Sequence, residues 1–129
     1  MVVQRRRIAL DEGRAALAAW QEANPGQADA PAAAPLPRAT LATAVRYSLE
    51  EVTARAPGNS VEVRVPPYGV TQCVEGPRHT RGTPPNVIEC DAGTWLEMVS
   101  GRLGWAEAVD AGRVAASGLR ADLSGLLPL

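Results

Sequence analysis

The stretch from Asn86 to Leu123 constrains the fold more than any other part of the chain. Its short apolar run, Val87–Cys90, ends at Asp91, an acid of the kind that begins a helix by accepting a hydrogen bond from a free backbone amide. A short helical segment follows, with apolar residues at spacings of three and four. Gly101 ends it, because glycine tolerates the left-handed conformation that commonly closes a helix. The pattern predicts a strand followed directly by a helix.

Two more glycines divide the rest of this stretch. A second short helix, about Trp105 to Ala111, stops at Gly112, and a strand-like run, Val114 to Ser117, stops at Gly118. A last, leucine-rich segment begins near Ala121. Strands and helices that alternate in this way indicate a mixed α+β unit.

The preceding part of the chain predicts a long helix and a hairpin. The helical pattern runs from Thr40, a residue type that caps helices, to about Ala56. We expect its inner face to hold Leu41, Val45, Ser48, Leu49 and Val52, and its outer face to hold Arg46, Glu50 and Thr53. The run Ser60–Val65 alternates apolar and polar residues, which is typical of a strand with one buried face. The turn Pro66–Gly69 and the returning run Val70–Val74 then predict an antiparallel hairpin.

The N-terminal part differs in character. Residues 4–23 have helical spacing with a thin apolar stripe, which predicts a helix that docks lightly on the domain or on a second copy of the chain. Residues 24–37 hold four prolines and a glycine, which break any helix. We therefore expect an N-terminal helix over 1–24, an Ala/Pro linker over 25–38 and one domain over 39–129.

The overall composition excludes several classes of protein. With 13 basic and 14 acidic residues, the net charge of −1 argues against nucleic-acid or anionic-membrane binding through net charge alone. No apolar run has the length of a signal-peptide core or of a membrane span. The sequence therefore predicts a cytoplasmic protein.

Four short motifs mark the ends of elements in the C-terminal half. They are Asp91, Gly101-Arg102-Leu103, Ala111-Gly112-Arg113 and Ala116-Ser117-Gly118. In this order they resemble the C-terminal half of the sterol carrier protein family. There a strand ends in an acid, one helix closes on Gly–basic–Leu, the next ends in Gly, and a strand ends in Ser–Gly.

Two motifs further upstream narrow the resemblance. Val65-Pro66-Pro67-Tyr68-Gly69 and the run from His79 to Asn86 are most similar to a small actinobacterial branch of that family, and the resemblance covers residues 41–129. It implies an α+β, sterol-carrier-like fold. The sheet would be small and mostly antiparallel, with four to five strands and with helices covering one face.

The resemblance also implies a ligand site. Sterol carrier proteins hold acyl chains and sterols between sheet and helices, and their last helix, here Ala121 to Leu129, helps to close the site. The residues expected to wall an apolar pocket are Trp95, Met98, Val99, Leu103, Trp105, Val109, Leu123, Leu126 and Leu127. From composition alone, the same residues fit a sealed core equally well. We call these nine residues the apolar set.

The sharpest polar feature is the loop containing Arg78, His79, Arg81 and Thr83. Two guanidinium groups, hydroxyls and a glycine-freed backbone can hold a phosphate or a carboxylate. Alternatively, Arg81 pairs with an acid such as Glu75, or the loop is simply exposed.

The candidates for catalysis are few. Cys73 and Cys90 lie in strand-like runs and are interpreted as small buried hydrophobes. His79 is the only histidine, and the sequence does not place it beside Cys73 or a serine. One His with two separated Cys makes a poor metal set. We expect no metal, no cofactor and no enzyme activity.

Two functions remain. The first is a carrier module, without catalysis of its own, for a fatty acyl or sterol-like molecule. The second is an interaction module that assists a separately encoded enzyme, because related folds form C-terminal domains of thiol-dependent isomerases and of acyltransferases.

Overall fold

The structure is a computed structural model that describes residues 6–25, 35–76 and 86–129. It contains four helices and four strands in these residues. In chain order they are α1 (Leu10–Ala23), α2 (Arg38–Arg55), β1 (Val61–Val65), β2 (Gly69–Cys73), β3 (Asn86–Cys90), α3 (Ala92–Val99), α4 (Trp105–Asp110) and β4 (Val114–Ser117).

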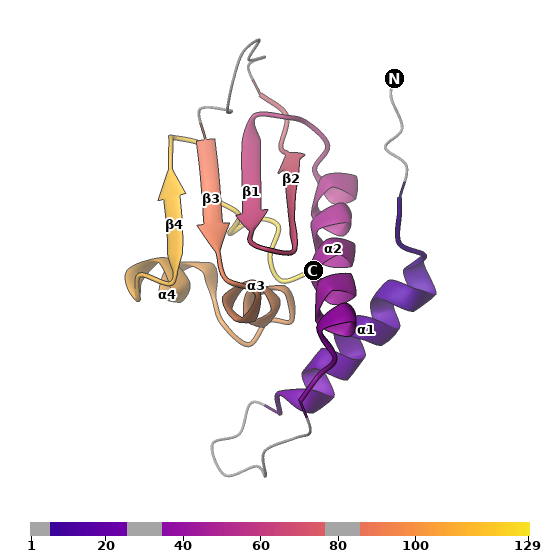
Figure 1. The fold of residues 1–129 in the computed structure, drawn as a ribbon. Helices are drawn as coiled ribbons and strands as arrows, with labels where there is room; N and C mark the ends of the chain where they lie inside the picture. The colour runs from indigo at the N-terminus through magenta and orange to yellow at the C-terminus, as the bar shows by residue number, and fades with distance from the viewer. Residues whose placement is uncertain (1–5, 26–34, 77–85) are drawn as a thin grey trace.

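The strands form one mixed sheet in the order β2-β1-β3-β4 (Figure 1). β1 pairs with β2 and β3 pairs with β4 in antiparallel fashion, whereas β1 and β3 run parallel. β2 runs antiparallel to β1, so it returns the chain to the end of the sheet at which the parallel strand β3 begins. The expected α+β class, with a small and mostly antiparallel sheet of four to five strands, is confirmed.

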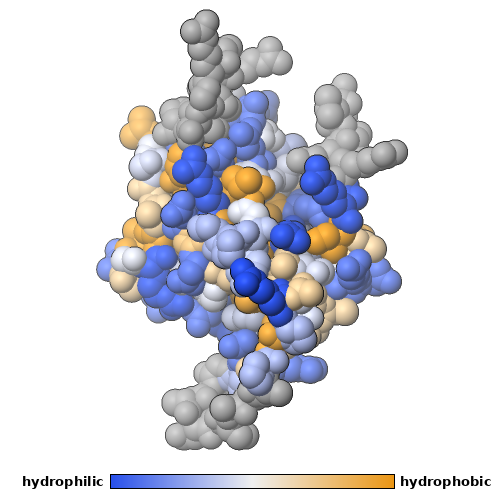
Figure 2. Space-filling model, viewed as in Figure 1, coloured by the Kyte–Doolittle hydropathy of each residue, from blue (hydrophilic) through white to orange (hydrophobic). Residues whose placement is uncertain are grey.

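Helices α2 and α3 supply most of the side chains that bury one face of the sheet. Every second residue of β1 points toward this face, as the sequence pattern predicted. These residues are Val61, Val63 and Val65, and all three are 0% exposed. Ile88 of β3 lies on the same face and is also fully buried. The opposite face carries partly or fully exposed side chains such as Glu89. Figure 2 shows polar residues interspersed with small apolar patches.

Two details of α2 differ from the sequence prediction. The helix begins at Arg38 and not at Thr40, because Pro37 holds the N-cap position with φ −55° and ψ 139°. Thr53, expected to point outward, is buried: its hydroxyl donates to the Gln72 carbonyl at 2.8 Å. The predicted inner face, which includes Val45 and Val52, is buried as expected.

The N-terminal helix α1 lies against the side of α2 that faces away from the sheet (Figure 1). The two helices approach closely at Gly13, where an added Cβ would lie 2.2 Å from Tyr47 Cδ1. Trp20 is only 5% exposed, and the Arg102 guanidinium lies 5.2 Å from its ring centroid. The helix therefore docks on its own domain, more firmly than its thin apolar stripe predicted.

Candidate functional site

Helix α3 forms the inner part of the apolar set. The Asp91 carboxylate accepts a hydrogen bond from the Thr94 amide at 2.7 Å, which confirms the predicted N-cap. Trp95, Met98 and Val99 are at most 2% exposed. Their side chains are packed in the common core with the strands and α2.

The outer part of the apolar set is less buried. Leu103, two residues before α4, and Trp105, its first residue, are partly buried against the core. Val109 is 37% exposed, so it lies at the surface and not in an enclosed wall. The buried residue of α4 is Ala108, which the sequence analysis did not select. An alanine gives a weak hydrophobic signal, although it fits where two elements approach closely.

The C-terminal segment, residues 121–129, is not the helix that the resemblance implied. It contains a turn at residues 124–126 and is otherwise irregular. The Asp122 carboxylate accepts a hydrogen bond from the Ser124 amide at 2.8 Å, which favours a local turn over a helix. Leu123 is fully buried, and Leu126 and Leu127 are partly buried against the core.

The C-terminal segment lies against the end of α3. The Leu129 amide donates to the Val99 carbonyl at 3.1 Å. A Cβ added at Gly101 would lie 3.5 Å from the Pro128 ring, and the φ of +81° at Gly101 confirms the predicted left-handed end of the helix. Apart from the Leu129 bond, no backbone hydrogen bond joins this segment to α3 in the described part of the chain. The segment is held mainly by its leucine side chains.

The predicted anion loop cannot be placed. Arg78, His79, Arg81 and Thr83 lie outside the described residues. Anion binding by these four residues therefore stays a prediction.

The two cysteines are free and buried, as the sequence predicted. Burial raises the pKa of the Cys73 thiol to about 11 and that of Cys90 to about 12. Both are thus neutral thiols at physiological pH, which are poor nucleophiles. In the parts of the chain that the structure describes, no group of three or more His, Cys, Asp and Glu could hold a metal ion.

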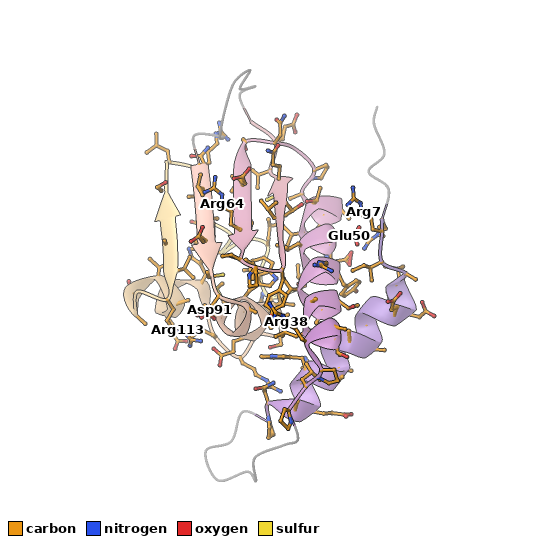
Figure 3. The ribbon with its side chains drawn as sticks, viewed as in Figure 1. Arg7, Arg38, Glu50, Arg64, Asp91 and Arg113 are labelled. Atoms are coloured by element: carbon orange, nitrogen blue, oxygen red, sulfur yellow. The ribbon has the colours of Figure 1, made fainter. Side chains whose placement is uncertain are left out.

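A surface hollow of about 720 Å³, which we call the edge hollow, lies between α2, β2 and the residues before α1. Its lining residues are Arg7, Ile8, Glu12, Thr43, Arg46, Leu49, Glu50, Tyr68, Gly69, Val70 and Thr71. Glu50 accepts hydrogen bonds from the Arg7 and Ile8 amides, which ties the segment before α1 to α2 (Figure 3). Sequence reasoning missed this site, because its residues come from three distant segments.

Two other hollows lie elsewhere on the surface. One, of about 320 Å³, is lined by residues of α1 and of the start of α2. The other, of about 450 Å³, lies over β1, β2 and β3 on the open face of the sheet. Neither these two nor the edge hollow is lined by residues of the apolar set.

A comparison with protein families shows to which family the chain belongs. A family model described as bacterial SCP ortholog, where SCP denotes sterol carrier protein, matches residues 37–129, which is most of the chain. The chain belongs to this family. The match begins at the N-cap of α2 and includes every strand, so the sterol-carrier-like fold is confirmed. Helix α1 lies outside it.

No curated protein matches the chain. The match to the bacterial SCP family supports the fold and suggests a lipid-binding carrier role. No helix in the described residues is long and apolar enough to cross a membrane.

Proposed function

We propose that this member of the bacterial SCP family is a carrier for a fatty acyl or sterol-like molecule, without catalysis of its own. The observation that carries the proposal is the family match over residues 37–129. Sterol carrier proteins hold such molecules between sheet and helices, and this chain has the same layers of sheet and helices.

The ligand would enter where the C-terminal segment covers the end of α3. Trp95, Met98 and Val99 are sealed in the core, so a ligand reaches them only if a covering segment moves. Residues 121–129 are the best candidate cover, because one backbone hydrogen bond, from Leu129 to Val99, ties them to α3. Moving an irregular segment breaks fewer backbone hydrogen bonds than unpacking a helix or a strand.

The energetics favour ligands with a long apolar tail. Lifting the end of this segment, with the fully buried Leu123 left in place, takes the partly buried side chains of Leu126, Leu127 and Leu129 off the core at a cost of at most about 3 kcal/mol each. Burial of a ligand returns roughly 0.8 kcal/mol per methylene, so about eleven buried methylenes offset the cost of opening. We therefore expect fatty acids of about 12 to 18 carbons to bind and short acids, below about eight carbons, to bind poorly.

The test is the thermal stability of the chain with palmitate, in wild type and in Leu126→Ala. Ligand at a hundredfold excess over its dissociation constant should stabilise the wild type by about 2.7 kcal/mol. In the bound state Leu126 would cover the ligand, so its truncation should weaken palmitate binding by about fivefold or more, which is roughly 1 kcal/mol.

Leu119→Ala is the matched control, because Leu119 is a nearby leucine with a fully exposed side chain. It should bind palmitate like the wild type. If no fatty acid or sterol raises the melting temperature of the wild type, the carrier proposal fails. If Leu126→Ala binds palmitate as tightly as Leu119→Ala, the proposed entry route fails.

A further inference from the structure

Strand β2 lies at the edge of the sheet, and one of its two edges forms no strand pairing. It pairs with β1 on one side only, and α2 runs beside its other edge (Figure 1). Three backbone groups along this edge form hydrogen bonds with α2 or with its C-cap residue, Ala56. Arg46 Nε donates to the Tyr68 carbonyl at 2.8 Å, Thr53 Oγ1 to the Gln72 carbonyl at 2.8 Å, and the Val74 amide to the Ala56 carbonyl at 2.7 Å.

These bonds fix the direction of the backbone groups in β2. Along an edge strand, alternate residues point both their N–H and their C=O away from the neighbouring strand. Gln72 points its carbonyl toward α2, so Val70, two residues earlier in the strand, does the same. The Tyr68 carbonyl also points toward α2, whereas the Tyr68 amide donates to the Val65 carbonyl within the turn. Neither the N–H nor the C=O of Val70 forms a hydrogen bond on that side with any residue that the structure describes.

The edge hollow lies over this interrupted stretch. Tyr68, Gly69, Val70 and Thr71 all line it, and Val70 is 59% exposed. A backbone N–H and C=O pair at an accessible strand edge is the feature to which an extended peptide adds. Here the stretch is short, because the Arg46 and Thr53 side chains occupy the edge on either side of Val70.

The charged side chains that line the edge hollow are distributed unevenly along it. Arg46 uses Nε to hold Tyr68, and its two terminal nitrogens form no hydrogen bond or ion pair within residues 6–25, 35–76 and 86–129. Glu50 follows one helical turn later on α2 and already accepts two backbone amides. Arg7 and Glu12 line the hollow from the α1 side. The two free terminal nitrogens of Arg46 thus lie near Tyr68, at the N-terminal end of β2.

We propose that the edge hollow binds the C-terminal end of an extended peptide from a partner protein. The peptide lies antiparallel to β2, which brings its free carboxylate to the Tyr68 end. There the Arg46 terminal nitrogens donate to the carboxylate. One peptide residue exchanges N–H and C=O hydrogen bonds with Val70, and an apolar side chain of the peptide packs on Ile8 and Leu49.

The site shares no residue with the apolar set, and it includes Arg7, Ile8 and Glu12, which lie outside the family match. It therefore does not depend on the carrier proposal, and either can fail without the other.

The experiment is a titration of the full chain, labelled with ¹⁵N, with a mixture of N-acetylated tripeptides of randomised sequence that end in a free carboxylate. We expect the backbone amide resonance of Val70 to move downfield, with smaller shifts at Thr71 and Gln72. The same mixture with amidated C-termini should shift these resonances at least fivefold less.

Two variants of α2 test the role of the guanidinium. Arg46→Gln should abolish the difference between the free-acid and the amidated mixtures. Arg38→Gln, which removes the same charge from an exposed position of α2 outside the hollow, should titrate like the wild type (Figure 3).

Three results would overturn the proposal. They are an unmoved Val70 amide at millimolar free-acid peptide, equal shifts with both mixtures, or displacement of the peptides by palmitate, which would make the hollow a lipid site. A fourth would do the same: shifts of Val70 that depend only on protein concentration, which indicate a second copy of the chain as the occupant.

Discussion

At the scale of single residues, Ser48 shows how one hydroxyl joins two helices. Its Oγ lies 2.9 Å and 2.8 Å from the Ala44 and Val45 carbonyls and accepts the Trp95 indole N–H at 2.8 Å. Ser48 and Trp95 are both 0% exposed. The spacing of apolar residues placed each of them on an inner face, but no periodic pattern pairs two side chains that are 47 positions apart.

Ser48→Ala should destabilise the protein by about 1–3 kcal/mol, because it leaves the buried Trp95 indole N–H without an acceptor. Ser100→Ala is the control. That hydroxyl is partly exposed and donates to the Leu96 carbonyl, which also accepts the Ser100 amide. Its loss should cost less than about 0.5 kcal/mol. Urea unfolding measures both, and equal losses would show that the Ser48–Trp95 bond contributes nothing.

At the scale of elements, local patterns predicted what local forces determine. The alternating valines of β1, the Asp91 cap and the glycine at the end of α3 were all predicted correctly. The errors concern contacts between distant segments. Thr53 is buried because β2 offers it the Gln72 carbonyl. The C-terminal segment was expected to be helical, although Gly125 and Pro128 oppose a helix and Asp122 forms a turn.

The nine residues of the apolar set illustrate the same limit for the site. Their hydrophobicity predicted that they face inward, and four of them are fully buried. Hydrophobicity does not distinguish a side chain that contacts other side chains from one that contacts a ligand. The edge hollow could not be predicted, because it depends on how α1 and α2 lie beside β2.

The α1–α2 contact depends on a glycine for reasons of space. Gly13→Ala should destabilise the chain by about 1–3 kcal/mol, since the new methyl group would overlap the buried Tyr47 ring. Gly93→Ala, in the first turn of α3, is the control. Its new Cβ would meet Asp91 Oδ1 at an ordinary 3.5 Å, so it should gain about 0.5–1 kcal/mol from helix propensity.

Thermal melting of the two glycine variants gives the answer. Opposite shifts in melting temperature are expected. A Gly13→Ala protein as stable as the wild type would mean that α1 is not held closely against α2.

At the scale of the whole molecule, helix α1 lies outside the part of the chain that matches the bacterial SCP family. The family match begins at residue 37, and α1 contacts the domain through α2 and through Arg102, whose guanidinium donates to the Gln21 and Asn24 carbonyls. The sheet, α2 and α3 supply most of the core residues.

A protein that starts at residue 37 should therefore still unfold cooperatively, but at a lower temperature, because it loses the burial of Ala16 and Trp20. Differential scanning calorimetry measures both properties. Full burial of a Trp side chain stabilises by about 3 kcal/mol or more, which corresponds to a drop of roughly 15 °C for a domain of this size. A broad, non-cooperative transition would show that α1 is part of the folding unit.

The central claim is that the domain carries an apolar ligand beneath the C-terminal segment. It is tested most directly by isotope-filtered NMR of the full chain with ¹³C-labelled palmitate, in which nuclear Overhauser effects report ligand protons close to protein protons. The account predicts such effects from the palmitate methylenes to Trp105, Leu126 and Leu127. Effects confined to other residues, or none at a concentration of palmitate that saturates other carriers, would contradict it.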